Sequence, residues 1–408
     1  MQPRPAPSGS PDSEAPKSGW QPLRDVRVLD FTALLPGPFA TLALADLGAD
    51  VVKVEPPAGD FARRMPSSLF RMANRNKRSI VLDLKHAAAP DIVRRLALWA
   101  DVAIEGFRPG VAERLRIGPA NLLAHNPRLI YCRLSGYGQS GPARHIPGHD
   151  LNYLCAAGAM ALAGHWGEAP RRSAIPVADL AGGTFAAIAI LAALHERARS
   201  GKGRVLDLSL AEAAMSFAAI RHGLDLDRPS QEHLWPTNDL FETADGEHIA
   251  LGIVEEHFWR NFASATQDLA PDLGEARYAT EADRRRNGDA LSARLREVMG
   301  MRRAADWLAR FERHDVPAQL RLTPAQASRS AQIVERQMVM AIDGERHIPF
   351  PVRVDGERGA ALRRLAPAAG EHSAGILEEI GLAREDIAAL AGSGLFGSEP
   401  APMEKEKA

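Results

Sequence analysis

Short apolar segments rich in β-branched residues alternate with helical patterns through the first half of this chain. Long crossover connections join parallel strands, whereas antiparallel neighbours are joined by short turns. The alternation therefore predicts an α/β fold with a Rossmann-like parallel sheet and helices on both of its faces. The segments with strand patterns are 26–30, 51–54, 79–84, 101–105, 129–134 and 204–208.

Changes in composition divide the chain into successive regions. The first residues are rich in Pro and Ser and have no apolar core, which is typical of a disordered tail. A β-hairpin signal around Asp245-Gly246 marks the beginning of a smaller α+β domain. The predicted division is a tail at 1–20, a large α/β domain at 21–225, a small domain at 236–322, a return to the large domain at 323–398, and a loose C-terminal tail at 399–408.

The charge balance excludes one class of partner. The 408 residues carry 50 basic and 51 acidic side chains, so the net charge is −1. Nucleic acids select basic surfaces, and we therefore expect no nucleic-acid partner. A local group of cations at Lys53, Lys77 and Lys85 suits either a small phosphorylated ligand or a solvated loop.

Cysteine use and apolar runs indicate the compartment. Cys132 and Cys155 form no Cys-x-x-Cys pair, so neither a metal site nor a disulfide framework is indicated. We expect two buried, reduced thiols, which fit a cytoplasmic protein. The longest apolar run, 180–194, is short for a membrane span, and no segment has the pattern of a signal peptide. We expect a buried helix at 180–194 and no membrane partner.

A histidine and an aspartate are the strongest candidates for chemistry. His149 lies between Gly148 and Asp150 at the start of a helical pattern, and Asp179 lies in Val-Ala-Asp-Leu-Ala-Gly-Gly. An imidazole and a carboxyl group suit a reaction that takes a proton from one face of a carbon and returns one to the other. The structural alternatives are an ordinary histidine at a helix start, and Asp179 as the N-cap of a helix from Leu180. An N-cap at Asp150 would place the imidazole near a helix N-terminus, whose backbone N–H groups could hold an enolate oxygen.

Small residues around Asp179 favour the functional interpretation. Ala178, Ala181, Gly182 and Gly183 would let a ligand approach closely. A carboxyl group partly buried among them has its charged form disfavoured, which suits an acid. Glu255, which follows the strand pattern at 249–252, is a third candidate; a helix-capping role, or the choice of its neighbour Glu256 instead, is the alternative.

Residues 136–141 match G-x-G-x-x-G after a strand pattern. A dinucleotide site requires this motif to begin a helix, but Pro142 and Pro147 follow at once. We interpret it as a loop that leads to His149 and expect no nicotinamide cofactor.

Several separate motifs, in order, resemble the family III CoA-transferase superfamily, and the Gly-His-Asp-x-Asn-Tyr form at 148–153 resembles its α-methylacyl-CoA racemase branch. The other motifs are Leu-Pro-Gly-Pro-Phe-Ala at 35–40 and the segments 47–55, 106–110, 135–142 and 370–373. The resemblance implies a Rossmann-type large domain, a small domain and two interlocked chains in a homodimer.

The resemblance also implies which residues bind substrate. An acyl-CoA would be the substrate, with no metal and no cofactor beyond the coenzyme A that the substrate carries. His149, Asp179 and Glu255 would be catalytic. The coenzyme A contacts carried over by motif would be Lys53, Leu82, Asp83, Leu84, Lys85, Phe107, Arg108, Gly148, Asp150 and Tyr153.

The reaction that this branch implies is racemisation or epimerisation of 2-methylacyl-CoA thioesters, with His149 and Asp179 as the two proton-transfer groups. The alternative is a CoA-transferase in which Asp179 attacks the thioester and forms a mixed anhydride. Two features are nearer to transferases, namely the short glycine run after Asp179 and Gly-Glu-His-Ser at 370–373. A third possibility is a CoA-binding protein that has lost activity.

Overall fold

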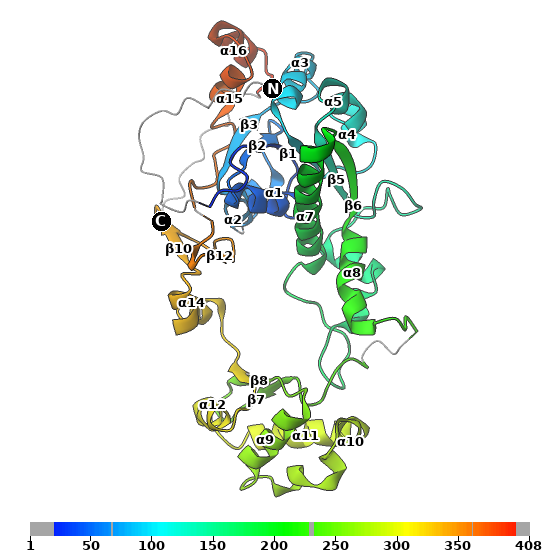
Figure 1. Ribbon diagram of the computed structural model, residues 1–408, viewed down its shortest axis with the longest axis vertical. Coiled ribbons are helices and arrows are strands. Elements are labelled where there is room, and N and C mark those ends of the chain that lie inside the picture. Colours follow the sequence, from blue (N-terminus) through cyan, green and yellow to red (C-terminus); the bar gives the residue numbers. More distant parts are fainter. Residues whose placement is uncertain (1–19, 67, 228–231, 361, 397–408) are drawn as a thin grey trace. The chain divides into compact units, whose positions relative to one another are not determined.

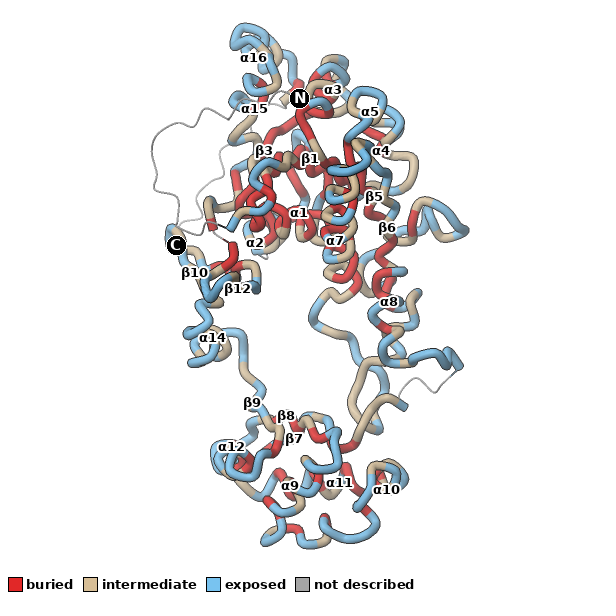
Figure 2. Tube along the Cα trace, viewed as in Figure 1, coloured by how far each residue is buried: buried red, intermediate tan, exposed pale blue. Residues whose placement is uncertain are grey.

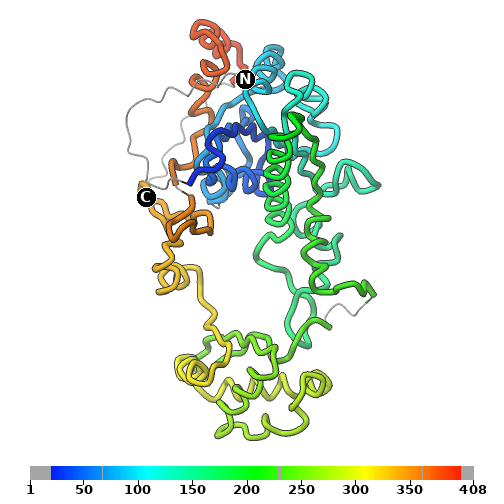
Figure 3. The backbone as a smooth tube through the Cα atoms, viewed as in Figure 1, coloured from blue at the N-terminus to red at the C-terminus, as the bar shows by residue number. Residues whose placement is uncertain are grey.

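The structure is a computed structural model that describes residues 20–66, 68–227, 232–360 and 362–396. The predicted tails at 1–20 and 399–408 lie outside these ranges except for Trp20, which is exposed. The described chain divides into two compact units. Unit 1 contains the residues up to His145, 182–209 and those from Glu335 onward, and unit 2 contains 146–181 and 210–334. Figure 3 lets the reader follow the chain through both units.

Unit 1 is built on a six-stranded sheet with the strand order β3-β2-β1-β4-β5-β6, and all neighbouring strands are parallel. This confirms the predicted parallel sheet (Figure 1). The order reverses direction between β1 and β4, and in sheets of this kind ligands bind at such a reversal, beyond the carboxyl ends of the strands. The strands are β1 (Arg27–Phe31), β2 (Asp50–Glu55), β3 (Lys77–Val81), β4 (Val102–Glu105), β5 (Ile130–Ser135) and β6 (Arg204–Ser209).

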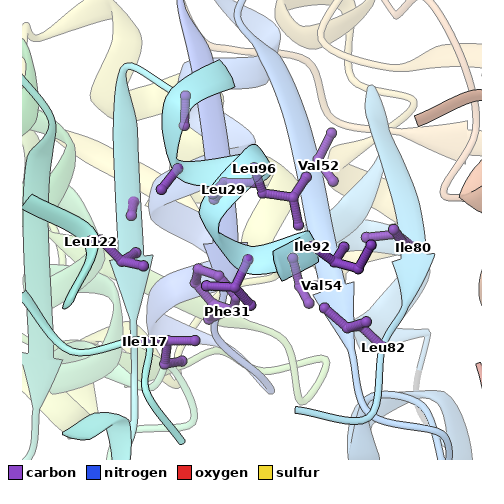
Figure 4. Close-up of a cluster of buried hydrophobic side chains, with 14 of the residues drawn as sticks. Leu29, Phe31, Val52, Val54, Ile80, Leu82, Ile92, Leu96, Ile117 and Leu122 are labelled. Carbon is purple, nitrogen blue, oxygen red and sulfur yellow. The ribbon is translucent and has the colours of Figure 1, made fainter. Parts of the chain in front are cut away.

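The main core of unit 1 lies between the sheet and helix α3 (Ala89–Trp99). Ile92, Val93 and Leu96 recur at helical spacing, so they form one apolar face that packs on the strands. Figure 4 shows Ile92 and Leu96 beside strand residues such as Val52. Burying each such side chain contributes about 1.5–3 kcal/mol. In unit 1, Figure 2 shows many buried residues in the strands and in helix α1 (Pro36–Asp46).

Helix α7 (Val177–Ser200) is, within the described residues, the one helix long and apolar enough to cross a membrane by length and composition. Its residues Ala181, Ala186 and Ile190 are nevertheless completely buried in the protein. The prediction of a buried helix at 180–194 is confirmed, although the helix is longer at both ends.

A chain of buried charged groups supports the carboxyl ends of β1 and β2. Lys77 and Lys53 have no exposed surface. The Lys77 ammonium lies 3.1 Å from the Asp30 carboxylate and donates to the Pro38 carbonyl at 2.9 Å. The Lys53 ammonium lies 2.9 Å from the Asp60 carboxylate and donates to the Thr32 carbonyl at 2.8 Å. We call Lys77, Asp30, Thr32, Lys53 and Asp60 the buried ion chain.

The charges of this chain perturb each other. Burial by itself would raise the pKa of Asp30, but the charges of Lys77 and Lys53 outweigh it and hold that pKa well below its usual range. Burial lowers the pKa of Lys77 to about 8, in part countered by Asp30. The Asp30 carboxylate and the Lys77 ammonium therefore each stabilise the charged form of the other.

Unit 2 contains a three-stranded antiparallel sheet in the order β7-β8-β9. The predicted hairpin around Asp245-Gly246 is confirmed, because β7 (Leu240–Glu242) and β8 (His248–Leu251) pair antiparallel across this turn. Strand β9 (Ala318–Leu320) pairs with β8. Helices α9 (Glu256–Thr266), α11 (Gly288–Met299) and α12 (Ala304–Arg313) contribute to an aromatic-rich core that includes Trp259, Phe262, Trp307 and Phe311.

The division into units differs from the one predicted from composition. Residues 146–181 and 210–225, which the sequence assigns to the large domain, group with unit 2, and the return to unit 1 begins at Glu335 and not at 323. The candidate residues His149 and Asp179 therefore belong to the same unit as the small domain.

The remaining elements complete the two units. They are α1 (Pro36–Asp46), η1 (Phe61–Arg64), α2 (Leu69–Asn74), α4 (Val111–Arg114), α5 (Pro119–His125), α6 (Asp150–Ala156), η2 (Ala159–Leu162), α8 (Leu210–His222), η3 (Pro271–Gly274), η4 (Ala276–Tyr278), α10 (Glu281–Arg286), α13 (Pro324–Ala327), α14 (Ala331–Glu335), β10 (Met340–Ile342), β11 (Glu345–His347), β12 (Arg353–Val354), β13 (Glu357–Arg358), α15 (Ser373–Glu379) and α16 (Arg384–Ala391).

The buried ion chain yields a stability prediction. Asp30→Asn leaves the Lys77 ammonium buried without its counter-charge, and breaking a buried pair in this way costs about 3–5 kcal/mol in the free energy of unfolding. Urea denaturation measures the loss. The control is Asp91→Asn, which breaks the exposed pairs with Arg94 and Arg95, where about 0.5 kcal/mol is expected. Similar midpoints for the two variants would contradict a central role for this chain.

Candidate active site

The segment 148–153 folds into a tight turn because its residues bond to each other. The Tyr153 hydroxyl donates to the Gly148 carbonyl at 2.5 Å. A Cβ at position 148 would lie 2.8 Å from the Tyr153 ring, so only glycine fits beneath it. The Asn152 side-chain oxygen accepts a hydrogen bond from the His149 backbone N–H at 3.0 Å. The turn fixes the backbone of His149 and leaves this residue exposed.

Helix α6 begins at Asp150, and His149 is its N-cap. The expectation that Asp150 is the N-cap of this helix is therefore wrong by one residue. The carboxylate of Asp150 instead caps a different helix. Its Oδ1 accepts hydrogen bonds from the backbone N–H groups of Ala178 at 2.7 Å and Asp179 at 3.2 Å, in the first turn of α7.

Asp150 therefore joins the two candidate catalytic segments. It follows His149 directly in the chain and holds the backbone of Asp179. The structure thus brings the start of α6 and the start of α7 together within unit 2.

Asp179 lies inside the first turn of α7, which starts at Val177, so it is not the N-cap of a helix from Leu180. Burial raises the pKa of Asp179 to about 7, and the charge of Asp150 adds to the shift. A carboxyl group with this pKa exists in both protonation states near neutral pH. It can therefore deliver a proton or remove one.

The two glutamates of the third candidate position have different surroundings. Glu256 is engaged, since its carboxylate pairs with Arg284 at 3.0 Å and accepts from the Glu281 backbone N–H at 2.7 Å. Glu255 is the N-cap residue of α9, is exposed, and makes no side-chain cap hydrogen bond. Of the pair, Glu255 has the carboxylate that can meet a ligand.

The small residues around Asp179 allow close packing within the protein. A Cβ at Gly183 would lie 2.7 Å from the Pro36 carbonyl oxygen and 2.9 Å from the Phe39 ring. Ala178 and Ala181 are completely buried. At Gly183 the close approach that glycine permits is that of the start of α1.

Two predicted coenzyme A segments lie at carboxyl ends of strands in unit 1. Leu82 to Lys85 follow β3; Leu82 is buried, Asp83 and Leu84 are half-buried, and Lys85 is exposed. Phe107 and Arg108 follow β4, beside the reversal of strand order; Phe107 is half-buried and Arg108 is exposed. These are the positions where open parallel sheets bind ligands.

Lys53, in contrast, is not available to a ligand. Its side chain is completely buried and its ammonium is held by Asp60 and Thr32. We therefore assign it a structural role in the buried ion chain, and the phosphate contact expected from the sequence is not part of our proposal.

Sequence reasoning missed Glu105. Burial raises its pKa to about 7, partly countered by the bond from the Phe107 backbone N–H and by Arg133. Its carboxylate accepts from that N–H at 2.7 Å and pairs with Arg133 at 3.3 Å. It thus orients the turn that carries Phe107 and Arg108. The sequence signal was a carboxylate ending an otherwise apolar strand.

Other candidate sites find no support in the described part of the chain. No group of three or more His, Cys, Asp or Glu side chains that could hold a metal ion occurs there. The G-x-G-x-x-G loop is followed by turns and not by a helix, and the Gln139 backbone N–H donates to Asp207 at 3.2 Å. The loop therefore lacks the helix N-terminus that a dinucleotide needs.

Together the parallel sheet, the reversal of strand order and the joined His149 and Asp179 segments define an α/β enzyme scaffold. Residues 23–373 match the family described as CoA-transferase family III, and the chain belongs to this family. It is therefore an enzyme of the CoA-transferase or racemase type, and acyl-CoA thioesters are the substrates that the family implies.

Similar proteins include members with both reactions. The chain is 33% identical over 386 residues to the alpha-methylacyl-CoA racemase of Mus musculus, covering 90% of this chain and 96% of that protein. It is 33% identical over 376 residues to the acetyl-CoA:oxalate CoA-transferase of Acetobacter aceti, covering 88% and 95%. The crystal structure of a CAIB/BAIF family protein from Brucella suis superposes with a TM-score of 0.79 at 30% identity, covering 88% and 99%.

The raised pKa of Asp179 predicts a pH-dependent effect on stability. Its pKa of about 7 lies above the ordinary 3.8, so its stabilising contribution is complete below pH 3.8 and is lost as the pH rises through about 7. Asp179→Asn stays neutral and should therefore raise the melting temperature more at pH 8 than at pH 5.

Differential scanning fluorimetry at the two pH values tests this expectation. The matched control is Asp306→Asn, which removes an exposed carboxylate from the first turn of α12. An equal shift of the melting temperature at both pH values for Asp179→Asn would show that its carboxyl group is not perturbed.

Proposed function

We propose that this enzyme racemises or epimerises 2-methylacyl-CoA thioesters by proton transfer at the α-carbon. The observation that carries the proposal is the junction at Asp150, which ties an exposed histidine to a carboxyl group with a pKa of about 7. A two-base reaction needs one group that is a base and another that is an acid at the same pH, and these two residue types supply both.

The proposed reaction has two proton transfers. Neutral His149 removes the α-proton of one enantiomer, which breaks the C–H bond, forms an enolate and leaves His149 as imidazolium. Protonated Asp179 delivers its proton to the opposite face, which forms the new C–H bond and leaves a carboxylate. The roles are reversed for the other enantiomer. No second acyl acceptor and no redox step are required.

The coenzyme A contacts proposed from the motifs are, within unit 1, the Leu82–Lys85 turn with Phe107 and Arg108. Within unit 2 they are Gly148, Asp150 and Tyr153. The Arg108 residue is exposed, and the carboxylates of Glu105 and Glu113 near it pair with Arg133 instead. An exposed arginine at a strand end suits a phosphate group. Glu255 is proposed as a further carboxylate at the site.

We also propose, on the resemblance of the motifs, that the enzyme is an interlocked homodimer in the cytoplasm. Size-exclusion chromatography with light scattering measures the molar mass in solution and so tests whether the enzyme is a dimer.

A CoA-transferase is the second candidate function, and the similar proteins named above include one. In that reaction Asp179 attacks the thioester as a nucleophile. The Gly-Glu-His-Ser segment does not favour this candidate, because the structure gives it a role in folding. The Gly370 backbone N–H donates to the Ser79 hydroxyl at 2.9 Å and the His372 ring accepts from the Ser79 backbone N–H at 3.3 Å, so the segment fastens α15 to the edge strand β3.

Isotope exchange distinguishes the candidates. In deuterated water, the wild type should exchange the α-proton of 2-methylacyl-CoA without an acyl acceptor. Asp179→Asn should still exchange one enantiomer, because His149 remains, while racemisation falls by about 10²–10⁴-fold. His149→Ala should exchange only the opposite enantiomer. Mass spectrometry gives the exchange, and chiral chromatography gives the racemisation.

The transferase gives a different pattern. It predicts a nearly active His149→Ala beside an inactive Asp179→Asn, with a new thioester when acyl-CoA donors and free acids are mixed. A protein that only binds coenzyme A would show neither exchange nor transfer. The control Asp306→Asn should behave as the wild type in every assay.

The assignment of Arg108 yields a separate kinetic prediction. Arg108→Ala should raise KM for the thioester about tenfold and change kcat by less than about twofold, because a phosphate far from the reacting carbon is bound equally in the ground and transition states. Arg94→Ala removes an exposed arginine of α3 and serves as the control. An unchanged KM in Arg108→Ala would remove this residue from the site.

A further inference from the structure

The loop between α6 and α7 joins the two candidate catalytic groups, and its middle is bound to the small domain, residues 236–322. Gly164 and Gly167 have φ values of 138° and 72°, which favour glycine, and they place His165 and Trp166 at the tip of a sharp bend. Both residues of this tip contact the small domain.

Asp239 receives the first part of the tip. Its carboxylate pairs with the His165 ring Nδ1 and accepts from the Trp166 backbone N–H at 3.0 Å. The same carboxylate accepts from the Leu240 backbone N–H at 2.7 Å, at the start of β7. Only 9% of the Asp239 side chain is exposed. The tip is therefore bonded to a nearly buried group that belongs to the small-domain sheet.

The indole ring of Trp166 makes the second contact. Its N–H donates to Asp289 Oδ1 at 2.9 Å. The ring lies against the backbone of Gly288 at the start of α11, where an added Cβ would lie 2.1 Å from a ring carbon. Glycine at 288 is thus required for the ring to occupy this position. Polar bonds and close packing together fix the tip in one place.

We propose that His165 and Trp166 are positioning residues: they anchor the loop between α6 and α7 to the small domain and so fix the placement of Asp179 relative to His149. The inference rests on the proposed function for its catalytic consequence. The loop ends at the first turn of α7. Motion of the loop would therefore displace the backbone N–H groups of Ala178 and Asp179, which donate to Asp150.

The effect on chemistry follows from the distances that proton transfer tolerates. Misplacement of a catalytic group by about 1 Å can lower a rate by as much as 10²-fold. A loosened loop also admits water to Asp179, which lessens the burial that raises its pKa. Asp150 is the charged group that faces Asp179 and contributes to that shift, and it remains in place in the variants below.

The test compares two substitutions that each remove one indole N–H bond from unit 2. Trp166→Phe loses the bond to Asp289, and Trp307→Phe loses a 2.8 Å bond to the Met299 carbonyl in the core. Gly288→Ala keeps both indoles and displaces the Trp166 ring. The first readout is hydrogen–deuterium exchange of the full-length protein, followed at the amides of residues 157–180.

We expect Trp166→Phe and Gly288→Ala to speed exchange at Ala178 and Asp179 and across the loop, whereas Trp307→Phe leaves these amides at the wild-type rate. With 2-methylacyl-CoA as substrate, Trp166→Phe and Gly288→Ala should lower kcat about tenfold and change KM less than about twofold. The loss of activity that accompanies deprotonation of Asp179 should also begin at a lower pH. A general loss of stability would not move this pH.

Two outcomes would overturn the inference. One is wild-type exchange at Ala178 and Asp179 in both anchor variants. The other is that Trp307→Phe shows the same faster exchange and lower kcat as Trp166→Phe. That result would mean that the Trp166 contacts act only through the overall stability of the unit. If the wild type shows no α-proton exchange, the proposed function fails, but hydrogen–deuterium exchange still decides whether the anchor holds the loop.

Discussion

Two lysine ammonium groups with no exposed surface support the region on which the candidate site depends. They hold the carbonyl groups of Thr32 and Pro38, on either side of the turn between β1 and α1. Within that turn Leu34 has a φ of 64°, an unfavourable value for leucine, and its N–H is held by Asp60 at 3.2 Å. Because buried charges are tolerated only with their partners, this turn has one stable arrangement. Helix α7 packs on it through Gly183.

The candidate site repeats this principle at a smaller scale. The Asp150 carboxylate accepts hydrogen bonds from the backbone of α7 and does not cap its own helix. This carboxylate therefore links two segments that are far apart in the chain. Burial raises the pKa of Asp179, and the charge of the same Asp150 carboxylate adds to the shift. Asp150 thus holds the backbone of Asp179 and also contributes to its electrostatics, which explains why the motif around His149 cannot be understood from the histidine alone.

The sequence predicted well those features that depend on periodicity and turn chemistry. The parallel sheet, the hairpin at Asp245-Gly246 and the buried helix after Asp179 all follow from local patterns. Features that depend on partners far away in the chain were not predictable. Lys53 looks like a free cation in the sequence but is paired with Asp60, and the close packing of Gly183 on α1 involves residues far earlier in the chain. Composition also could not reveal that residues 146–181 group with the small domain, since this depends on contacts such as that of Trp166 with Asp289.

The turn at 148–153 also bears on how chemistry can diverge on this fold. Two of its hydrogen bonds, from the Tyr153 hydroxyl to the Gly148 carbonyl and from the His149 backbone N–H to the Asn152 side chain, hold the backbone on either side of position 149. Neither of these two bonds depends on which side chain stands at position 149. Exchanging that single side chain alters the available reactivity while the scaffold persists, so related enzymes can acquire different reactions without redesigning their architecture.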